Sequence, residues 1–511
     1  MRTKWFRVLL RRRIQVALLL ILQIAFLIWL LYGGVIQSRI VDVLLTVVSF
    51  AVALHVVSKR DKGAYKIAWL FIILLFPPAG GIFYLLCHVQ RSTRRFRRDI
   101  ETIDGKTRQL FLLCGDKLGE FSQAHPQQET SVAYLQHYAG FPVFEHTKTR
   151  YLTPGEEFFP VLLEELEKAE HYIFFEYFIV QEGKMWNAIL DVLKRKAAQG
   201  VKVRVMYDDM GCFFLLPKDY RKTLESYGIE CAVFNPFRPL LTAMQNNRDH
   251  RKITSIDGRV AFTGGANLAD EYINGYAKHG YWKDASVMLE GEAAWSFTVM
   301  FLQMWELARG VREDVSAYYP WKDAPCEVSS DGWVQPYGDS PMDEEHVSEH
   351  VYMQLFNRAR NYIYINTPYL ILDDSMLSAL ELAAKSGVDV RIVTPHVWDK
   401  YLVHMTTRSY YADLLRAGVR VYEFTPGFMH AKTVVCDDEA ATVGTVNMDF
   451  RSLYLHFECG VRMYESAAVA QVRDDFLKTL EVCHEMTLPE CEVGALRSVG
   501  RQILRLFAPL M

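Results

Sequence analysis

The distribution of apolar positions separates the amino-terminal region from the rest of the chain. Residues 14–36 form an apolar run of 23 residues without a charged side chain. As a helix this run would be about 34 Å long, which is enough to cross the roughly 30 Å hydrocarbon core of a bilayer. A second apolar run covers 41–57, and a third covers 64–88, where a Pro-Pro-Ala-Gly-Gly sequence at 77–81 interrupts it. Residues 1–98 are therefore predicted to form a membrane region.

The charges beside these runs predict how they cross the membrane. Positive charge flanks the start of the chain, the connection after the second run and the exit from the third run. The positive-inside tendency would place all three flanks in the cytoplasm, which three complete crossings cannot do. We therefore expect 14–36 and 41–57 to cross as a hairpin and 64–88 to be re-entrant, because such breaks are tolerated where protein covers the freed backbone groups. Three ordinary crossings with one exceptional flank are the alternative.

Beyond a linker predicted at 99–145, short alternating apolar runs are separated by helical patterns, which is typical of an α/β fold. Helical patterns that are followed by glycine cover 185–199 and 375–386. The runs also recur, since Gly-Val-Lys-Val-Arg-Val at 200–205 resembles Gly-Val-Asp-Val-Arg-Ile at 387–392. A repeat of about 180 to 190 residues suits a duplicated domain. We predict two similar halves, 146–330 and 331–511, packed about a pseudo-two-fold axis.

Charge and cysteine usage narrow the possible partners. Residues 1–98 contain 16 Lys and Arg against two acids, or +14, and the whole chain carries −3, so residues 99–511 carry −17. Such an acidic region argues against sustained contact with a nucleic acid. The nine cysteines are odd in number and contain no CxxC pair, so we expect scattered thiols rather than a disulfide framework or a zinc site. A cytoplasmic catalytic region agrees with this usage.

The strongest chemical signal is a pattern of His, Lys and Asp that occurs twice with the same spacing. The copies are His250, Lys252 and Asp257, and His430, Lys432 and Asp437. An asparagine stands 17 residues after each histidine, and a carboxylate follows at a matching place. These residues are Asn267 and Asn447, and Asp284 and Glu458. Alternation along a strand places each His and Lys on one face, and the small-residue turn before each Asn lets backbone amides approach an anion.

Two imidazoles, two ammonium groups and two amides at one point suit a phosphodiester. The lysines would offset charge and the asparagines would donate hydrogen bonds to the substrate, so no metal or cofactor is required. One histidine would attack phosphorus while the other, protonated, hands a proton to the leaving alcohol. Near symmetry leaves these roles open, and we take His250 as the nucleophile. Asp284 and Glu458 would orient the histidines, whereas Asp257 and Asp437 face away, which favours structural ion pairing.

These motifs resemble the phospholipase D superfamily, and more closely the bacterial cardiolipin synthases. Further segments carry the resemblance, namely Gly264–Tyr272, Trp282–Asp284, Asn447–Ser452, the Pro-Pro-x-Gly-Gly sequence and Arg505–Met511. The resemblance implies that both His-Lys-Asp sets are catalytic and that no cofactor is needed. It implies transfer of a phosphatidyl group between two phosphatidylglycerol molecules through a phosphohistidine, giving cardiolipin and glycerol at the bacterial cell membrane. Anionic membrane lipids would be the partners.

The chain departs from that family at two positions and leaves rival functions open. Thr445 stands where Ser is usual, and His456 stands where Asn is more frequent. A phospholipase D-type hydrolase or a phosphatidylserine-type synthase would use the same motifs, and water exclusion would decide between transfer and hydrolysis. The arginines of a carboxyl-terminal amphipathic pattern recur every four residues, either to meet an anionic interface or to dock the helix on the domain; they are Arg497, Arg501 and Arg505. The oligomeric state is not predicted.

Overall fold

The computed structural model describes residues 25, 39–88, 91–237 and 243–510. The chain divides into two compact units. The smaller unit combines Met1–Phe96 with Pro236–Asn246 and Leu506–Leu510, and the larger unit contains Arg97–Asn235 and Asn247–Arg505.

The larger unit is built from two sheets with the same strand order. The first sheet has the order β1-β9-β7-β6-β2-β3-β4, and the main path of the second is β10-β17-β16-β15-β11-β12-β13-β18. The first strands are β1 (Thr147–Leu152), β2 (Tyr172–Tyr177), β3 (Lys202–Asp208), β4 (Glu230–Phe234), β6 (Lys252–Ile256), β7 (Val260–Gly264) and β9 (Ser286–Gly291). The second are β10 (Trp333–Asp339), β11 (Tyr362–Asn366), β12 (Asp389–Pro395), β13 (Arg420–Phe424), β15 (Thr433–Cys436), β16 (Ala440–Gly444), β17 (His456–Tyr464) and β18 (Cys483–Glu485). The α/β fold and its repetition are confirmed.

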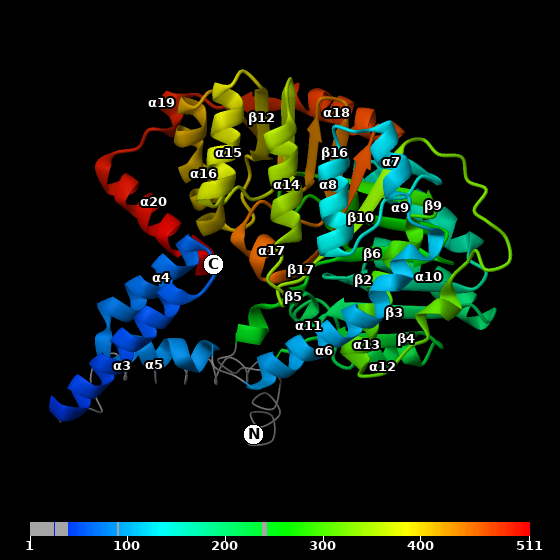
Figure 1. The fold of residues 1–511 in the computed structure, drawn as a ribbon. Coiled ribbons are helices and arrows are strands. Elements are labelled where there is room, and N and C mark those ends of the chain that lie inside the picture. Colours follow the sequence, from blue (N-terminus) through cyan, green and yellow to red (C-terminus); the bar gives the residue numbers. More distant parts are fainter. Residues whose placement is uncertain (1–24, 26–38, 89–90, 238–242, 511) are drawn as a thin grey trace, which may run out of the picture. The chain divides into compact units, whose positions relative to one another are not determined.

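Helices cover the sheets of both halves (Figure 1). Those of the first half are α9 (Gly155–Lys168), α10 (Lys184–Ala198), α11 (Asp209–Cys212), α12 (Tyr220–Glu225) and α13 (Ala294–Arg309). Those of the second are α14 (Val347–Arg358), α15 (Asp374–Lys385), α16 (Tyr401–Arg416), α17 (Phe450–Tyr454), α18 (Ala467–Leu480) and α19 (Leu488–Cys491). The last helix, α20 (Ala495–Phe507), has no buried residue. Strand β2 is buried along its length, and its side chains alternate between two layers. Ile173 and Phe175 pack in the cluster that contains α9 and α10, whereas Phe174 stacks on Phe301 of α13 at 4.6 Å.

The two halves pack against each other through their antiparallel strands. Strand β16 contacts β7 and β9, and β17 contacts β7. Thr263 of β7 lies 3.4 Å from the sulfur of Cys459 of β17, so the contact is fully buried. All nine cysteines fall within the described residues and are free thiols.

Residues 99–145, where a linker was expected, are largely helical. They include the end of α6 (Arg91–Thr107), then η1 (Arg108–Cys114), α7 (Leu118–Ala124), α8 (Glu129–Tyr134) and η2 (Leu135–Ala139). Phe121 is fully buried and its ring lies edge-on to Trp333 and Tyr464, at 5.4 and 5.1 Å. The helical segment therefore adds its own apolar side chains to the core of the second half.

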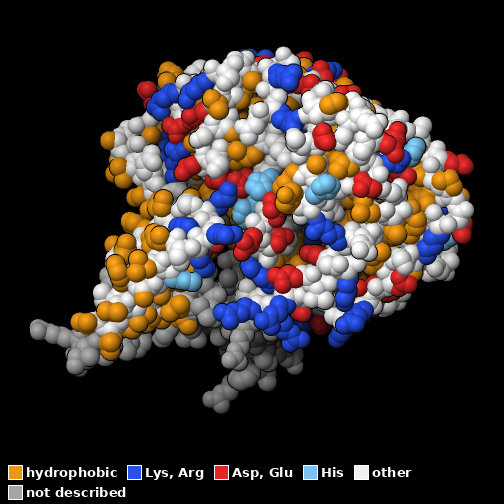
Figure 2. Space-filling view, viewed as in Figure 1, with side chains coloured by type: hydrophobic (Ala, Val, Ile, Leu, Met, Phe, Trp, Pro, Cys, Tyr) orange, Lys and Arg blue, Asp and Glu red, His pale blue; other side chains and the backbone are white. Residues whose placement is uncertain are grey.

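The smaller unit is a helical cluster formed by α3 (Arg39–Ser58), α4 (Gly63–Leu75), α5 (Pro77–His88) and η6 (Ala508–Leu510). A β-carbon on Gly81 would lie 2.7 Å from the backbone of Ser49, so glycine permits α3 and α5 to approach closely. Hydrophobic side chains gather on the surface of α3 and α4 (Figure 2), and those on α3 include Val43, Leu44, Val47, Phe50, Leu54 and Val57.

Two of the three predicted membrane segments fall on helices that the structure describes. The 41–57 run lies on α3, and the interrupted 64–88 run forms α4 and α5, with the break at the proline pair. The 14–36 run lies almost wholly outside the described residues. Among the helices that are described, none combines the length and the apolar character needed to cross a membrane.

Candidate active site

The two motif histidines stand at equivalent places, because β6 begins at Lys252 and β15 begins one residue after Lys432. His250 follows the two-residue strand β5 (Arg248–Asp249), which pairs in parallel with the start of β17. His430 follows β14 (Gly427–Met429), which pairs in parallel with β8 (Tyr281–Lys283). The strand before each motif histidine therefore pairs with a strand of the other half. The backbone N–H of His250 donates to Phe457 at 2.9 Å, and that of His430 donates to Lys283 at 2.7 Å.

The carboxylate that follows each motif forms a hydrogen bond with the histidine of the other half. Nδ1 of His250 lies 2.9 and 3.0 Å from the two oxygens of Glu458. Nδ1 of His430 lies 2.6 Å from Asp284. Both carboxylates are completely buried. Each half therefore supplies the hydrogen-bond partner for the histidine of the other half, and the motifs lie near enough for the charge of Lys432 to act on His250.

A carboxylate at Nδ1 sets the tautomer of each imidazole. The Nδ1–H group donates to the carboxylate, and Nε2 is left with its lone pair. Burial lowers the pKa of His430 to about 4, and the charge of Lys432 adds to this while Asp284 opposes it. Burial also lowers the pKa of His250 well below its ordinary value, with Lys252 and Lys432 acting in the same direction. These shifts favour the neutral form of both imidazoles.

The two lysines are buried cations beside the histidines. Nζ of Lys252 donates to the carbonyl of His250 at 2.6 Å, and Nζ of Lys432 donates to the carbonyl of His430. Burial lowers the pKa of Lys252 to about 8 and that of Lys432 to about 7, against the raising effect of the nearby carboxylates. Within the described part of the chain, no carboxylate forms an ion pair with either lysine. Their charge is available to an anionic substrate.

The two asparagines differ although their spacing is the same. Both side-chain ends of Asn267 are used, because Oδ1 accepts from Ile179 N–H at 3.0 Å and Nδ2 donates to the Tyr272 hydroxyl at 2.8 Å. Oδ1 of Asn447 has no partner among the described residues, and the side chain is buried. The NH₂ group, which would donate to a substrate, is engaged with Tyr272 in Asn267, whereas that of Asn447 has no hydrogen bond to the described residues.

The motif aspartates hold the backbone of the neighbouring strand. Asp257 accepts from the N–H groups of the three residues that lead into β2, and Asp437 accepts from the equivalent three before β11; these are Glu170, His171 and Tyr172, and Arg360, Asn361 and Tyr362. The partners are backbone amides rather than the expected ion pairs. Asp257 and Asp437 have positive φ angles of 52° and 56°, so their turns also have the same shape.

The small-residue turns support the crossed carboxylates in two ways. A β-carbon at Gly265 would lie 2.0 Å from a carboxylate oxygen of Asp284, so glycine leaves the space that Asp284 fills. Thr445, the matching residue, donates its hydroxyl to Glu458. The departure from the usual Ser therefore keeps its hydrogen bond.

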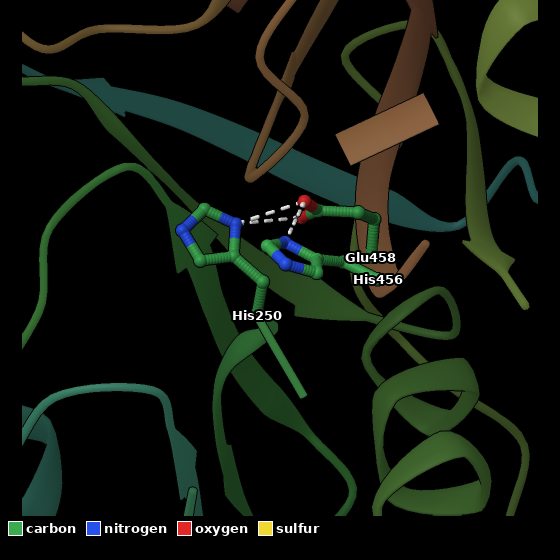
Figure 3. A group of neighbouring side chains, drawn as sticks. All are labelled: His250, His456 and Glu458. Carbon is green, nitrogen blue, oxygen red and sulfur yellow. Dashed lines mark hydrogen bonds and ion pairs between the residues drawn. The ribbon is translucent and has the colours of Figure 1, made fainter. Parts of the chain in front are cut away.

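The rings around the histidines include residues that the sequence did not indicate. Tyr272 lies 5.4 Å from His430, and Phe178 lies 5.1 Å from His250, both edge-on. Trp282 lies 5.1 Å from His430, whereas its repeat counterpart His456 lies 5.4 Å from His250. Tyr272 ends the Gly264–Tyr272 segment that carries the resemblance, whereas Phe178 has no such signal in the sequence. Figure 3 shows His456 beside His250 and Glu458.

The arrangement suits chemistry on a phosphodiester. Two neutral imidazoles can attack or accept a proton through Nε2, and two buried ammonium groups can stabilise charge on oxygen. A bound phosphodiester anion raises the pKa of the nearby imidazoles, which allows one of them to act as an acid.

Comparisons with known proteins agree with this geometry. A family model described as "Cardiolipin synthase, PLD-like domain" matches residues 162–305 and 352–480, together more than half of the chain. A second model, "Phospholipase D-nuclease N-terminal", matches residues 47–87. The match to the first model covers both motif histidines.

Individual relatives cover most of the chain. An uncharacterized protein of Streptococcus mutans is 42% identical over 90% of this chain and 99% of its own length. The cardiolipin synthase of Alkalihalophilus pseudofirmus is 36% identical over 88% of this chain and 90% of its own, and cardiolipin synthase 2 of Bacillus anthracis is 34% identical over 91% and 90%. A phosphatidylserine synthase structure from Haemophilus influenzae covers 73% of this chain and 96% of its own with a TM-score of 0.54 at 15% identity, which shows a common fold.

Proposed function

The chain belongs to the cardiolipin synthase family of phospholipase D-like proteins, and on this basis we propose that it joins two phosphatidylglycerol molecules into cardiolipin and glycerol. It is a phosphatidyltransferase. The observation that carries the proposal is the crossed pairing of His250 with Glu458 and of His430 with Asp284. One phosphodiester replaces another in this reaction, so no nucleotide is needed to drive it.

In the first half-reaction, Nε2 of His250 attacks phosphorus of one phosphatidylglycerol. Protonated His430 hands its proton to the departing oxygen of glycerol, and a phosphatidyl-histidine remains. Nζ of Lys432 lies 3.1 Å from Nε2 of His430, and a cation there disfavours attack by that nitrogen. That contact supports His250 as the nucleophile. The same ammonium lowers the pKa of His430, so the charge of the bound phosphodiester has to favour its protonation.

In the second half-reaction, neutral His430 takes the proton of a hydroxyl on a second phosphatidylglycerol. That oxygen attacks phosphorus, and the bond to His250 breaks. Lys252 and Lys432 stabilise charge on the phosphoryl oxygens, and Asn447 donates to them through its NH₂ group. Asp257 and Asp437 act on the strands rather than on the substrate.

The amino-terminal region would hold the enzyme at the bacterial cell membrane. The proposal is supported by the length of the apolar run 14–36 and by the exposed apolar side chains of α3. Two crossings with a re-entrant third segment would leave the catalytic unit in the cytoplasm, next to its lipid substrates. A reporter fused after Arg98 tests this, because an extracytoplasmic signal would contradict it.

The function is tested with purified protein and phosphatidylglycerol alone, with products identified by mass spectrometry. Cardiolipin and glycerol in equal amounts are expected. Phosphatidic acid as the main product would instead identify a hydrolase. A requirement for serine would identify a phosphatidylserine-type synthase.

A further inference from the structure

The side chain of His456 has no role in the phosphatidyl transfer described above, yet it is buried in the site. Its exposed fraction is 8%, and neither ring nitrogen has a hydrogen-bond partner among the described residues. A buried polar group without a partner costs free energy, so an unengaged imidazole here favours a ligand.

His456 faces two groups that also bind metals. Its Nδ1 lies 3.8 Å from an oxygen of Glu458, which is too long for a hydrogen bond. Nδ1 of His250 lies 2.9 Å from the same oxygen. One ligand atom from each of the three residues lies within 4.8 Å of the other two. Figure 3 shows both rings and the carboxylate turned toward one another.

These distances suit a small transition-metal ion. Bonds of about 2.1 Å in a tetrahedral site separate neighbouring ligands by about 3.4 Å, and the observed 2.9 and 3.8 Å lie on either side of that value. His456 and Glu458 are two residues apart on β17, so they share one face of the strand. Two imidazoles and a carboxylate are ligands that zinc prefers.

We infer that His250, His456 and Glu458 form an inhibitory site for Zn²⁺ and ions of its class. A metal on Nδ1 of His250 takes the place of the hydrogen bond to Glu458. The single proton of the neutral ring then resides on Nε2, which loses the lone pair needed to attack phosphorus or accept a proton. The metal binds reversibly and no bond to the lipid forms.

The other half of the repeat provides an internal comparison. Trp282 stands where His456 stands, so the surroundings of His430 and Asp284 contain one imidazole instead of two. Among the described residues, the His250 site is the one group with three such ligands close together. The inhibition therefore acts on one histidine of the pair.

The test begins with chelator-treated, full-length protein in detergent and Zn²⁺ in equilibrium dialysis. We expect one high-affinity ion per chain. Removing a residue that only hydrogen-bonds to a metal ligand weakens metal binding by about 10- to 100-fold. His456→Asn removes a direct ligand, so it should weaken Zn²⁺ binding by at least about tenfold. The matched control is His484→Asn, because His484 forms an exposed pair with Glu490 at 2.8 Å outside the site. That variant should bind Zn²⁺ as the unaltered protein does.

Two readouts complete the test. Pulsed electron paramagnetic resonance of the Cu²⁺-loaded, unaltered protein should detect two coordinated imidazoles, and this measurement does not depend on any variant folding. Turnover of phosphatidylglycerol should fall with Zn²⁺ in the unaltered protein and in His484→Asn, and far less in His456→Asn, each compared with its own metal-free rate.

Binding that is absent, that involves fewer than two imidazoles, or that is equally tight in His456→Asn would overturn the inference. The inhibition step rests on the proposed transferase function, whereas the dialysis and resonance measurements do not. Metal binding that depends on His456 in a protein that makes no cardiolipin would therefore retain the site and reject the function.

Discussion

The two halves of the larger unit have one scaffold but different surroundings for their histidines. His250 is held by Glu458, which accepts from Thr445, and has His456 beside it. His430 is held by Asp284 and lies against Trp282. Seven strands have the same order in both halves, so the different surroundings come from the side chains at matching positions. A duplicated fold can thus supply two positions of similar geometry, and single substitutions beside each histidine can then separate their chemical roles.

The largest effect should come from the histidines themselves. His250→Asn and His430→Asn should each lower kcat by about 10⁴-fold or more, because nucleophile and acid act as one unit. The double variant should lose little beyond either single variant. Rates of cardiolipin formation measure this, and a strictly additive loss would indicate two independent sites.

The next largest loss of kcat should come from Asp284 and Glu458, the carboxylates that bind the histidine of the other half. Asp284→Asn and Glu458→Gln keep the shape but weaken control of the tautomer, so each should lower kcat by about 10³-fold. Single-turnover experiments separate the two halves, since Glu458→Gln should slow formation of the covalent intermediate more strongly. Equal slowing by both variants in that step would contradict the division of roles.

The pH profile should report the two lysines in the free enzyme. Their lowered pKa values, about 7 for Lys432 and about 8 for Lys252, mean that charge is present below these values and lost above them. We expect kcat/KM to fall by about tenfold per pH unit between about pH 7 and 8, where one charge is lost, and by about a hundredfold per pH unit above that, where both are lost. On the acid side it should fall where His250 takes up a proton, because a protonated ring cannot attack phosphorus, and burial places that pKa well below its ordinary value. A flat basic limb up to pH 10 would contradict the assignment.

A smaller loss of kcat should come from the hydroxyl of Thr445, which the matching turn of the first half lacks at Gly265. Thr445→Val removes the hydroxyl that donates to Glu458 and should lower kcat by about tenfold, because a hydrogen bond to a charged group is lost. Thr445→Ser is the matched control and should remain close to the unaltered rate. If both variants behave alike, the hydroxyl does not support Glu458.

The motif aspartates should affect stability rather than turnover. Asp257→Asn should lower the free energy of unfolding by about 1–3 kcal/mol, because a buried acceptor of three N–H groups is weakened. Asp437→Asn should lower it less, because that residue is only half-buried. Denaturant titration of the purified protein measures both. A loss of kcat as large as that of the histidine variants would show a catalytic role instead.

The repeat and its chemistry could be predicted because both reside in short local patterns. The doubled spacing of His, Lys and Asn predicted two α/β halves, and matching positions indicated Asp284 and Glu458 as partners of the histidines. The exchange of these partners could not be predicted, since it depends on the pairing of β5 with β17 and of β14 with β8. The roles of the site residues stay predictions.

Other features depend on contacts that lie far apart in the chain. Asn267 and Asn447 have equal spacing, but Tyr272 engages only Asn267. Residues 99–145 have mixed polarity in sequence, and their helices become evident only where Phe121 meets Trp333. Local periodicity cannot reveal such partners, because the apolar surface that stabilises each segment belongs to a distant strand.

The central claim is that two halves build one site with a single nucleophile, and trapping the intermediate tests it most directly. Protein mixed with phosphatidylglycerol that carries labelled phosphorus is quenched in acid and mapped by peptide. The account predicts that the label resides on His250 and does not exceed one phosphorus per chain. Label on His430 would reverse the roles, and label on both histidines of the same chain would contradict a single shared site.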